Sequence, residues 1–254
     1  MRLGTTLSRR SRLTPLCQQT TSAIQGRLAD LAYYRVKIDG LPGPATSDAI
    51  VRFKARNGLR ARDFVGPITL GKLFSPDAVS EEIPKAQAGV PPWLAEARRL
   101  LGVREVPGPG NNPKIMWWAQ NLDQWYTGDD VPWCGLFVAH CMAFGAPDEP
   151  QDFNRLGARA WAKYGAVVDT DTLRLGAIAV FWRTHPVNSW HGHVAFVTGV
   201  SPTAIRVIGG NQSNAVTETW IARKRLLTCV GPKNWNYWKP APFTKTGVLS
   251  TNEA

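Results

Sequence analysis

The stretch VPWCGLFVAHC, residues 131–141, decides the fold of the carboxyl-terminal part of the chain. Pro132 sets a turn, and the apolar residues after it are spaced for a buried helix that begins at Cys134. The unpaired amides and the positive dipole end of a helix start favour a thiolate, so we expect the pKa of Cys134 to lie below the value of about 8.5 for a free thiol. Cys134 is therefore a candidate nucleophile, and the alternative is a structural cysteine at a helix start.

Three segments with the composition of β-strands follow this helix, at residues 177–182, 192–198 and 204–208. His193 opens the second of them. An imidazole fixed there can take the thiol proton and later protonate a leaving amine. His191 is the alternative base, but it precedes Gly192 and is expected in the loop.

The third strand runs into residues 209–213, Gly-Gly-Asn-Gln-Ser. The amide oxygen of Asn211 is predicted to accept the other N–H of His193 and so to fix the tautomer and orientation of the ring. Turn chemistry is the alternative for this residue, because Asn is common in such turns. If Asn211 only shapes the turn, Gln212 or a backbone carbonyl is the next candidate for the orienting role.

A cysteine on a helix, followed by a histidine and an asparagine on strand ends, is the order found in papain-like amidohydrolases. The stretches GVREVPGPGNNPKI, VPWCGLFVAHC, LGARAWAKYG, GAIAVFWR, GHVAFVTG and IRVIGGNQS resemble the CHAP-related family of phage endolysins and bacterial wall enzymes. The resemblance implies Cys134, His193 and Asn211 as the catalytic set. Many CHAP domains carry an acid just before the polar third member, whereas this chain has Gly209 and Gly210, which leaves a fourth catalytic acid in doubt.

Substrate contacts are predicted at Glu105, Trp133 and Gln212. Glu105 is the acid in the motif-like stretch before the helix, and it either contacts substrate amines or only caps a turn. A group of aromatic residues is either a sugar-stacking wall or part of the core: Trp117, Trp118, Trp125 and Tyr126.

The remaining cysteines, Cys17, Cys141 and Cys229, have no partner base nearby in the sequence and are expected to be buried or incidental thiols. The chain has no CxxC pair and no histidine spacing that suits zinc. We therefore expect neither a metal site nor another cofactor.

The amino-terminal part repeats one device, Gly-Pro-x-Thr, at residues 43–46 and 66–69. Gly and Pro set a turn, and the hydroxyls of Thr46 and Thr69 are predicted to cap the helices that follow. The segment IQGRLADLAYYRVKIDGLPGPATSDAIVRFKARNGL, with its echo FVGPITLGKLF, resembles the three-helix peptidoglycan-binding domain of wall-lytic enzymes. Lys54 departs from that family, which usually has glutamine there. A packing module without a ligand is the alternative.

These patterns predict an α+β protein with a small three-helix bundle followed by a papain-like domain of helices packed on an antiparallel sheet. The expected segments are a basic tail (1–17), the peptidoglycan-binding domain (18–75), a linker (76–90), the cysteine amidohydrolase domain (91–240) and a carboxyl-terminal tail (241–254). The second domain is expected to open with a helix after Pro91-Pro92 that ends at Gly102 and has one apolar face: Trp93, Leu94, Ala97, Leu100 and Leu101.

The net charge of +11 is concentrated in the first 90 residues, which hold 14 basic and 7 acidic residues. Such a balance suits nucleic acid or an anionic bacterial wall or outer-membrane surface. No nucleic-acid-binding motif accompanies it, so peptidoglycan is the predicted partner of a monomeric protein. The sequence shows no secretory signal and no span of ~20 apolar residues, which predicts cytoplasmic production in the host cell without stable membrane insertion, and action on the wall after release.

Taken together, the patterns predict an endolysin-type peptidoglycan hydrolase that cleaves an amide through a thioester. The bond is either within the stem peptide, as for an endopeptidase, or the muramoyl-alanine bond, as for an amidase. The alternatives are a bacterial wall-remodelling enzyme or secreted antibacterial effector with the same chemistry, and a wall-binding protein without catalysis.

Overall fold

The computed structural model describes residues 15–81, 89–122, 125–183, 190–236, 238–245 and 249. The chain forms two compact units that divide between Glu82 and Ile83. Cys17 lies where the side chains are not described. Among the described residues, no helix is long and apolar enough to cross a membrane.

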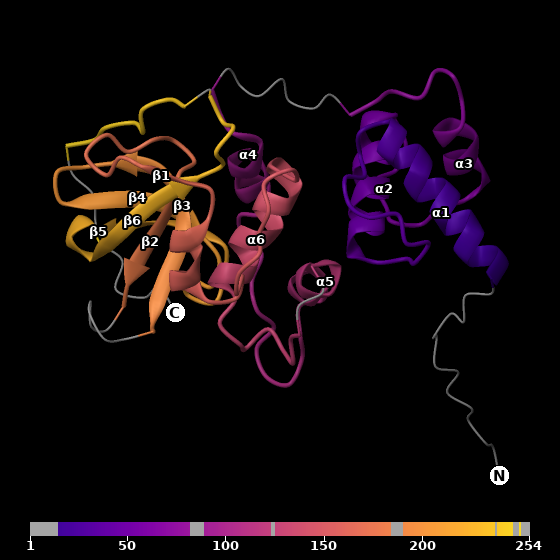
Figure 1. The fold of residues 1–254 in the computed structure, drawn as a ribbon. Helices are drawn as coiled ribbons and strands as arrows, with labels where there is room; N and C mark the ends of the chain where they lie inside the picture. Colours follow the sequence, from indigo (N-terminus) through magenta and orange to yellow (C-terminus); the bar gives the residue numbers. More distant parts are fainter. Residues whose placement is uncertain are drawn as a thin grey trace, which may run out of the picture. The chain divides into compact units, whose positions relative to one another are not determined.

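The first unit is a bundle of helices around its own apolar core (Figure 1). Its described helices are α1 (Pro15–Asp30), α2 (Pro44–Arg56) and α3 (Pro67–Leu73). Ile24, Leu28 and Leu31 are buried, and they pack with Phe53 of α2 and Leu73 of α3. The predicted three-helix bundle is therefore confirmed.

The predicted capping by the two threonines is wrong. Gly43 and Gly66 occupy the N-cap positions, and neither helix start has a side-chain cap. Because the proline that follows each glycine is the first helical residue, each threonine lies inside the first turn. There it is buried, and the hydroxyl of Thr46 accepts a hydrogen bond from Gln25 Nε2 at 3.0 Å. The threonines therefore belong to the interior of the bundle.

Two buried polar side chains hold the loops of this unit. The Oε1 atom of Gln25 accepts hydrogen bonds from the amides of Asp39 and Gly40, at 3.2 and 2.9 Å. Lys54 is buried, and its Nζ donates to the carbonyl of Phe64 at 2.8 Å. Each interaction satisfies a polar group that would otherwise be costly to bury. The unusual lysine of α2 thus anchors the loop that leads into α3.

The second unit combines helices with one antiparallel sheet, as predicted. Its described helices are α4 (Pro92–Arg99), α5 (Pro113–Asn121), α6 (Cys134–Gly145) and two short 3-10 helices, η1 (Ala158–Lys163) and η2 (Arg223–Arg225). The described strands are β1 (Ala166–Val168), β2 (Ile178–Trp182), β3 (Gly192–Val200), β4 (Ala204–Gly209), β5 (Thr217–Ala222) and β6 (Leu226–Gly231).

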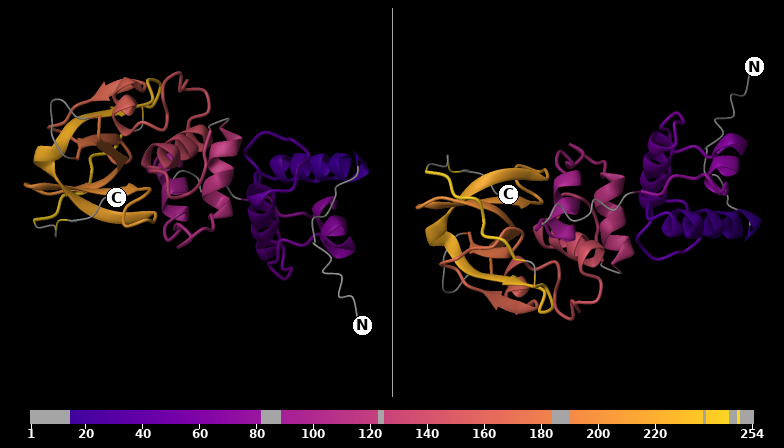
Figure 2. Two further views of the ribbon diagram at one scale, coloured as in Figure 1. Left: turned by 90° about the horizontal axis from the view of Figure 1, so that it is seen from below. Right: turned by 90° about the horizontal axis from the view of Figure 1, so that it is seen from above.

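The described strands run in the order β1-β6-β2-β3-β4-β5, and each neighbouring pair is antiparallel. The helices α4, α5 and α6 lie on one side of this sheet (Figures 1 and 2). Neighbouring strands β2 and β3 are in register, with Phe181 opposite His193. The sheet therefore brings the end of β2, the start of β3 and the loop after β4 toward one another.

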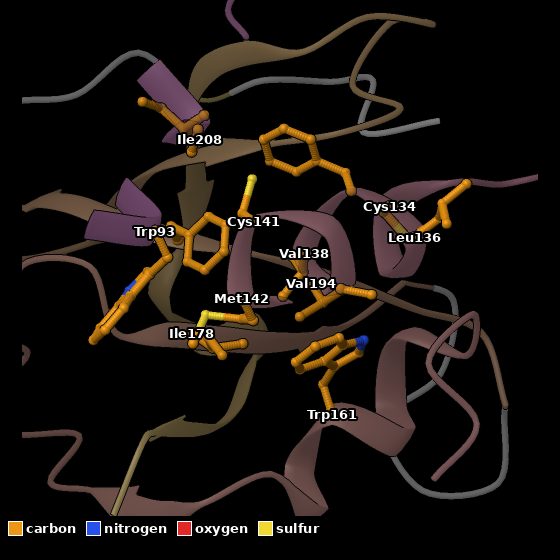
Figure 3. Close-up of a cluster of buried hydrophobic side chains, with 14 of the residues drawn as sticks. Trp93, Cys134, Leu136, Val138, Cys141, Met142, Trp161, Ile178, Val194 and Ile208 are labelled. Atoms are coloured by element: carbon orange, nitrogen blue, oxygen red, sulfur yellow. The ribbon is translucent and has the colours of Figure 1, made fainter. Parts of the chain in front are cut away.

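Helix α6 lies in the centre of the unit, and its residues from Cys134 to Met142 are all buried. Figure 3 shows Val138 and Met142 of this helix beside Val194 and Ile178 of the sheet. A helix that is apolar on all sides is stable only where other elements surround it. The sheet and the other helices thus fix the direction in which α6 presents its first residue.

Helix α4 covers α6, and a buried charge network joins the two helices. Glu96 accepts hydrogen bonds from Arg99 at 2.8 Å and from His140 at 3.1 Å. Burial alone would raise the pKa of Glu96, but the bonds from Arg99 and His140 lower it. The predicted apolar face of α4 is buried except for Leu101, which is 44% exposed because the helix ends before it.

Candidate active site

Cys134 is the first residue of α6, as predicted. The backbone amides of Val194 and Gly135 lower the pKa of its thiol, and Val194 directly follows His193 on β3. The expected fall in the pKa of the thiol is not found: burial raises the pKa of Cys134, and these amides offset only part of the increase. The helix start is a favourable place for a thiolate, but removal from water has the larger effect here.

His193 is buried on β3 and has two different ring nitrogens. Nε2 lies 3.0 Å from Oε1 of Gln212, whereas Nδ1 is buried and has no hydrogen-bond partner. Burial lowers the pKa of His193 to about 4, although the bond to Gln212 acts in the opposite direction and the charge of Arg183 lowers it further. The imidazole is therefore neutral at pH 7.

Gln212 determines which nitrogen of that neutral ring carries the proton. Its Nε2 donates to the carbonyl oxygen of Thr217 at 2.6 Å and to the Thr217 hydroxyl at 3.1 Å. A carbonyl can only accept, so the amide must point its Oε1 at His193. The proton of the neutral imidazole therefore lies on Nε2, and Nδ1 keeps a lone pair that can act as a base.

The predicted bond from His193 to Asn211 is wrong, because the neighbouring residue makes that bond. Asn211 has a positive φ of 56°, a conformation that Asn tolerates better than most residues. Its side chain turns away from His193. With the amide oriented to satisfy both neighbours, Nδ2 donates to Oε1 of Glu105 at 3.0 Å and Oδ1 accepts from the amide of Trp133 at 3.2 Å.

Trp133 and Asn211 donate hydrogen bonds to the same carboxylate oxygen of Glu105. The indole Nε1 of Trp133 donates to Glu105 Oε1 at 2.7 Å. The ring of Trp133 is fully buried, so it is part of the core and does not offer the predicted surface to a substrate. Glu105 is half-buried, and burial raises the pKa of its carboxyl group.

Close backbone packing brings the loop after β4 against α6. A Cβ atom on Gly210 would lie 2.5 Å from Cβ of Phe137 and 2.7 Å from the ring of Trp133. Real side chains essentially never approach so closely, so the glycine is needed at this position. It places Asn211 and Gln212 beside the start of α6 and β3.

The other candidate residues lie outside this network. His191 is exposed and stacks on Trp190, with ring centroids 4.0 Å apart, so the structure favours His193 over His191 as the base. Cys141 and Cys229 are buried, as expected. Within the aromatic group, Trp118 belongs to the core and Trp125 is 71% exposed.

Comparison with protein families agrees with both predicted domains. Residues 18–73 match the family described as a putative peptidoglycan binding domain, and residues 125–211 match the CHAP domain. The chain carries a peptidoglycan-binding domain followed by a CHAP domain. No curated protein and no solved structure matches the chain. The two domains together mark a cell-wall hydrolase, and the CHAP domain is of the class of cysteine- and histidine-dependent amidases or peptidases that act on peptidoglycan.

The matched part of the CHAP domain contains Cys134 and His193 but ends one residue before Gln212. Glu105 lies before it. The sequence analysis predicted Gln212 and Glu105 as substrate contacts. For Gln212, the sequence does not show which of the two adjacent amides, Asn211 or Gln212, faces the histidine. The signal that favours Gln212 is the left-handed conformation at Asn211, which the sequence could suggest only through the Gly-Gly-Asn turn.

Proposed function

We propose that this protein is an endolysin-type hydrolase that cleaves a peptidoglycan amide with Cys134 as nucleophile, His193 as base and Gln212 as the residue that orients the base. The observation that carries the proposal is the hydrogen bond between His193 Nε2 and Gln212 Oε1, which leaves Nδ1 buried and unpaired. Gln212 takes the role that the sequence suggested for Asn211.

The reaction begins with a neutral thiol and a neutral imidazole, as the raised pKa of Cys134 and the lowered pKa of His193 require. Nδ1 of His193 removes the thiol proton while Sγ attacks the carbonyl carbon of the substrate amide. The C–N bond then breaks, and the imidazolium returns the proton to the leaving amine. A thioester remains on Cys134.

Water completes the cycle. His193 takes a proton from the water, the resulting hydroxide attacks the thioester, and the carboxylic acid product leaves as Sγ recovers its proton. The amide of Cys134 at the start of α6 provides part of the oxyanion hole for both tetrahedral intermediates. The positive end of the helix dipole favours the negative charge that develops there.

Mass spectrometry of the muropeptides released from purified sacculi tests the proposal and identifies the bond. New amino termini within stem peptides indicate an endopeptidase, and glycan strands with free lactyl ends indicate an amidase. Cys134→Ala is the control that removes the nucleophilic sulfur. If that variant released the same products at the same rate, Cys134 would not be the nucleophile; if the wild-type protein released no products, the chain would be a wall-binding protein without catalysis.

The endolysin role, as distinct from wall remodelling or an antibacterial effector, needs a cellular test. We expect production inside a bacterium to leave the cells intact until the membrane is permeabilised, and then to cause lysis that depends on Cys134. Turbidity after permeabilisation with chloroform measures this. Permeabilised cells that stay intact while purified sacculi are hydrolysed would argue for a remodelling enzyme or an effector.

A further inference from the structure

We propose that Glu105 is a positioning residue that clamps the turn preceding the nucleophile: one carboxylate oxygen holds Trp133 at two places, directly through its indole and indirectly through Asn211. The proposal rests on the proposed role of Cys134. It gives Glu105 and Asn211 a shared task that differs from substrate contact and from histidine orientation.

The hydrogen bonds among Glu105, Asn211 and Trp133 form a closed ring. Oε1 of Glu105 accepts from Trp133 Nε1 at 2.7 Å and from Asn211 Nδ2 at 3.0 Å, and Asn211 Oδ1 accepts from the Trp133 amide at 3.2 Å. Trp133 thus has both its ring and its main chain tied to a single oxygen atom. Since Trp133 immediately precedes Cys134, the clamp sets where α6 begins.

The main-chain amide of Trp133 needs such a partner. Trp133 is the N-cap residue of α6, and its own side chain makes no capping hydrogen bond. The first amides of a helix have no acceptor within the helix. Asn211 supplies one from the loop after β4, which couples the start of the nucleophile helix to the loop that also carries Gln212.

Glu105 is itself fixed to that loop. Its amide donates to the carbonyl of Asn214 at 2.9 Å, and the preceding residue, Arg104, forms a β-bridge with Ala215. The carboxylate therefore does not depend on a flexible segment for its position. A clamp built on paired backbone can hold a catalytic turn more accurately than one on a free loop.

The ionisation of Glu105 matters because a carboxylate accepts charge-assisted hydrogen bonds, which are stronger than neutral ones. Burial raises the pKa of Glu105, the bond from Trp133 lowers it, and the charges of Asp129 and Asp130 raise it further. Tyr126 is a further titratable group near Glu105: burial raises its pKa, and the charges of Cys134 and Glu105 raise it further. The clamp is strongest above the pKa of Glu105 and weakens as the pH falls through it.

The test compares Glu105→Ala, Asn211→Gly, the double variant and Glu105→Gln, with Asp130→Asn as the matched control. Asn211→Gly removes the amide but keeps the left-handed backbone accessible. Asp130 is exposed and lies near Glu105, so its variant removes a neighbouring charge while leaving the clamp in place. Release of muropeptides gives kcat and KM, and thermal denaturation shows whether each variant is folded.

We expect each single change to lower kcat by roughly tenfold with KM nearly constant, and the double variant to be no worse than the poorer single one, because the two residues act as a unit. Glu105→Gln should recover most of the rate, since its amide oxygen can still accept both donors. Its pH profile should lose the acidic decline that Glu105 causes. Asp130→Asn should keep the wild-type kcat and KM at neutral pH, and its acidic decline should move to lower pH because the charge of Asp130 raises the pKa of Glu105.

Three results would overturn the clamp: a rise in KM at constant kcat, which indicates a substrate contact; losses in the double variant that simply multiply; or wild-type kcat in folded Glu105→Ala. Cys134→Ala in the same assay distinguishes failure of the proposed reaction from failure of the clamp. If Cys134→Ala stays active, the proposed reaction fails, whatever Glu105 does.

Discussion

Replacing Gln212 with Met tests the link between a buried amide and the tautomer of the catalytic histidine. The change keeps the length of the side chain but removes the hydrogen bond to His193 and both bonds to Thr217. Two groups lose their partners, the Nε2–H of His193 and the carbonyl of Thr217. At about 1–3 kcal/mol for each unsatisfied buried group, we expect a stability loss of roughly 2–6 kcal/mol.

The catalytic effect has a different cause. Without Gln212, the neutral imidazole is free to carry its proton on Nδ1, and in that form it cannot accept the thiol proton. In a Ser-His-Asp enzyme, replacing the charged third residue removes control of the histidine tautomer and lowers kcat by about four orders of magnitude. A neutral partner such as Gln212 contributes less. We therefore expect Gln212→Met to lower kcat by roughly tenfold to thousandfold. KM should change little, because Gln212 is buried and its side chain is bonded to His193 and Thr217.

The assay measures kcat and KM from muropeptide release, together with urea denaturation to confirm that the variant is folded. Gln212→Glu is the informative second variant. His193 is neutral above its pKa of about 4, so protonation of this ring should add a fall in activity only below about pH 4, beyond the decline at higher pH that Glu105 causes. A carboxylate at position 212 stabilises the imidazolium and should move the fall due to His193 to higher pH. A folded Gln212→Met protein with wild-type kcat would refute the orienting role.

Three further predictions concern the thiol, the first domain and the packing of the site. Because burial raises the pKa of Cys134, its alkylation by iodoacetamide in the native protein should keep accelerating above pH 9, as mapped by mass spectrometry; a plateau at neutral pH would indicate a preformed ion pair. Alkylation should abolish hydrolysis, whereas EDTA should leave it unchanged; loss with EDTA that zinc restores would contradict a thiol mechanism. Deleting residues 1–85 should weaken sacculus binding and its salt sensitivity while soluble muropeptides are still cleaved; equal binding by residues 91–254 would argue against a wall-binding role. Gly210→Ala should cost about 1–3 kcal/mol in urea denaturation, because the added methyl group overlaps Phe137 and Trp133; unchanged stability would show that the loop can relax.

Periodicity in the sequence was sufficient to place the main elements of the site. The apolar run after Pro132 became α6 with Cys134 as its first residue, and the predicted strand with His193 became β3. Both predictions rest on local patterns, a buried helix and a β-branched run, that tertiary structure preserves. Strands β1, β5 and β6 were not predicted, because β1 and β5 are only partly buried and none of the three shows strict alternation of buried and exposed residues.

The finer assignments failed where three-dimensional packing decides between neighbours. Asn211 and Gln212 are adjacent amides, and only the left-handed turn at Asn211 shows which of them faces His193. The pKa of Cys134 was misjudged because a helix dipole can be inferred from sequence, whereas the degree of burial at the helix start cannot. Thr46 followed the pattern of a cap, but the proline before it had already begun the helix.

Each unit of the chain encloses a separate set of buried side chains, the first centred on Leu28 and Phe53 and the second on α6 and the sheet. Substitutions that are far apart and share no partners usually have additive energetic effects. Mutations in one core are therefore not expected to require compensation in the other. Such a chain can acquire a new wall specificity through its first unit, or a new cleavage preference through its second, along mutational paths that do not constrain each other.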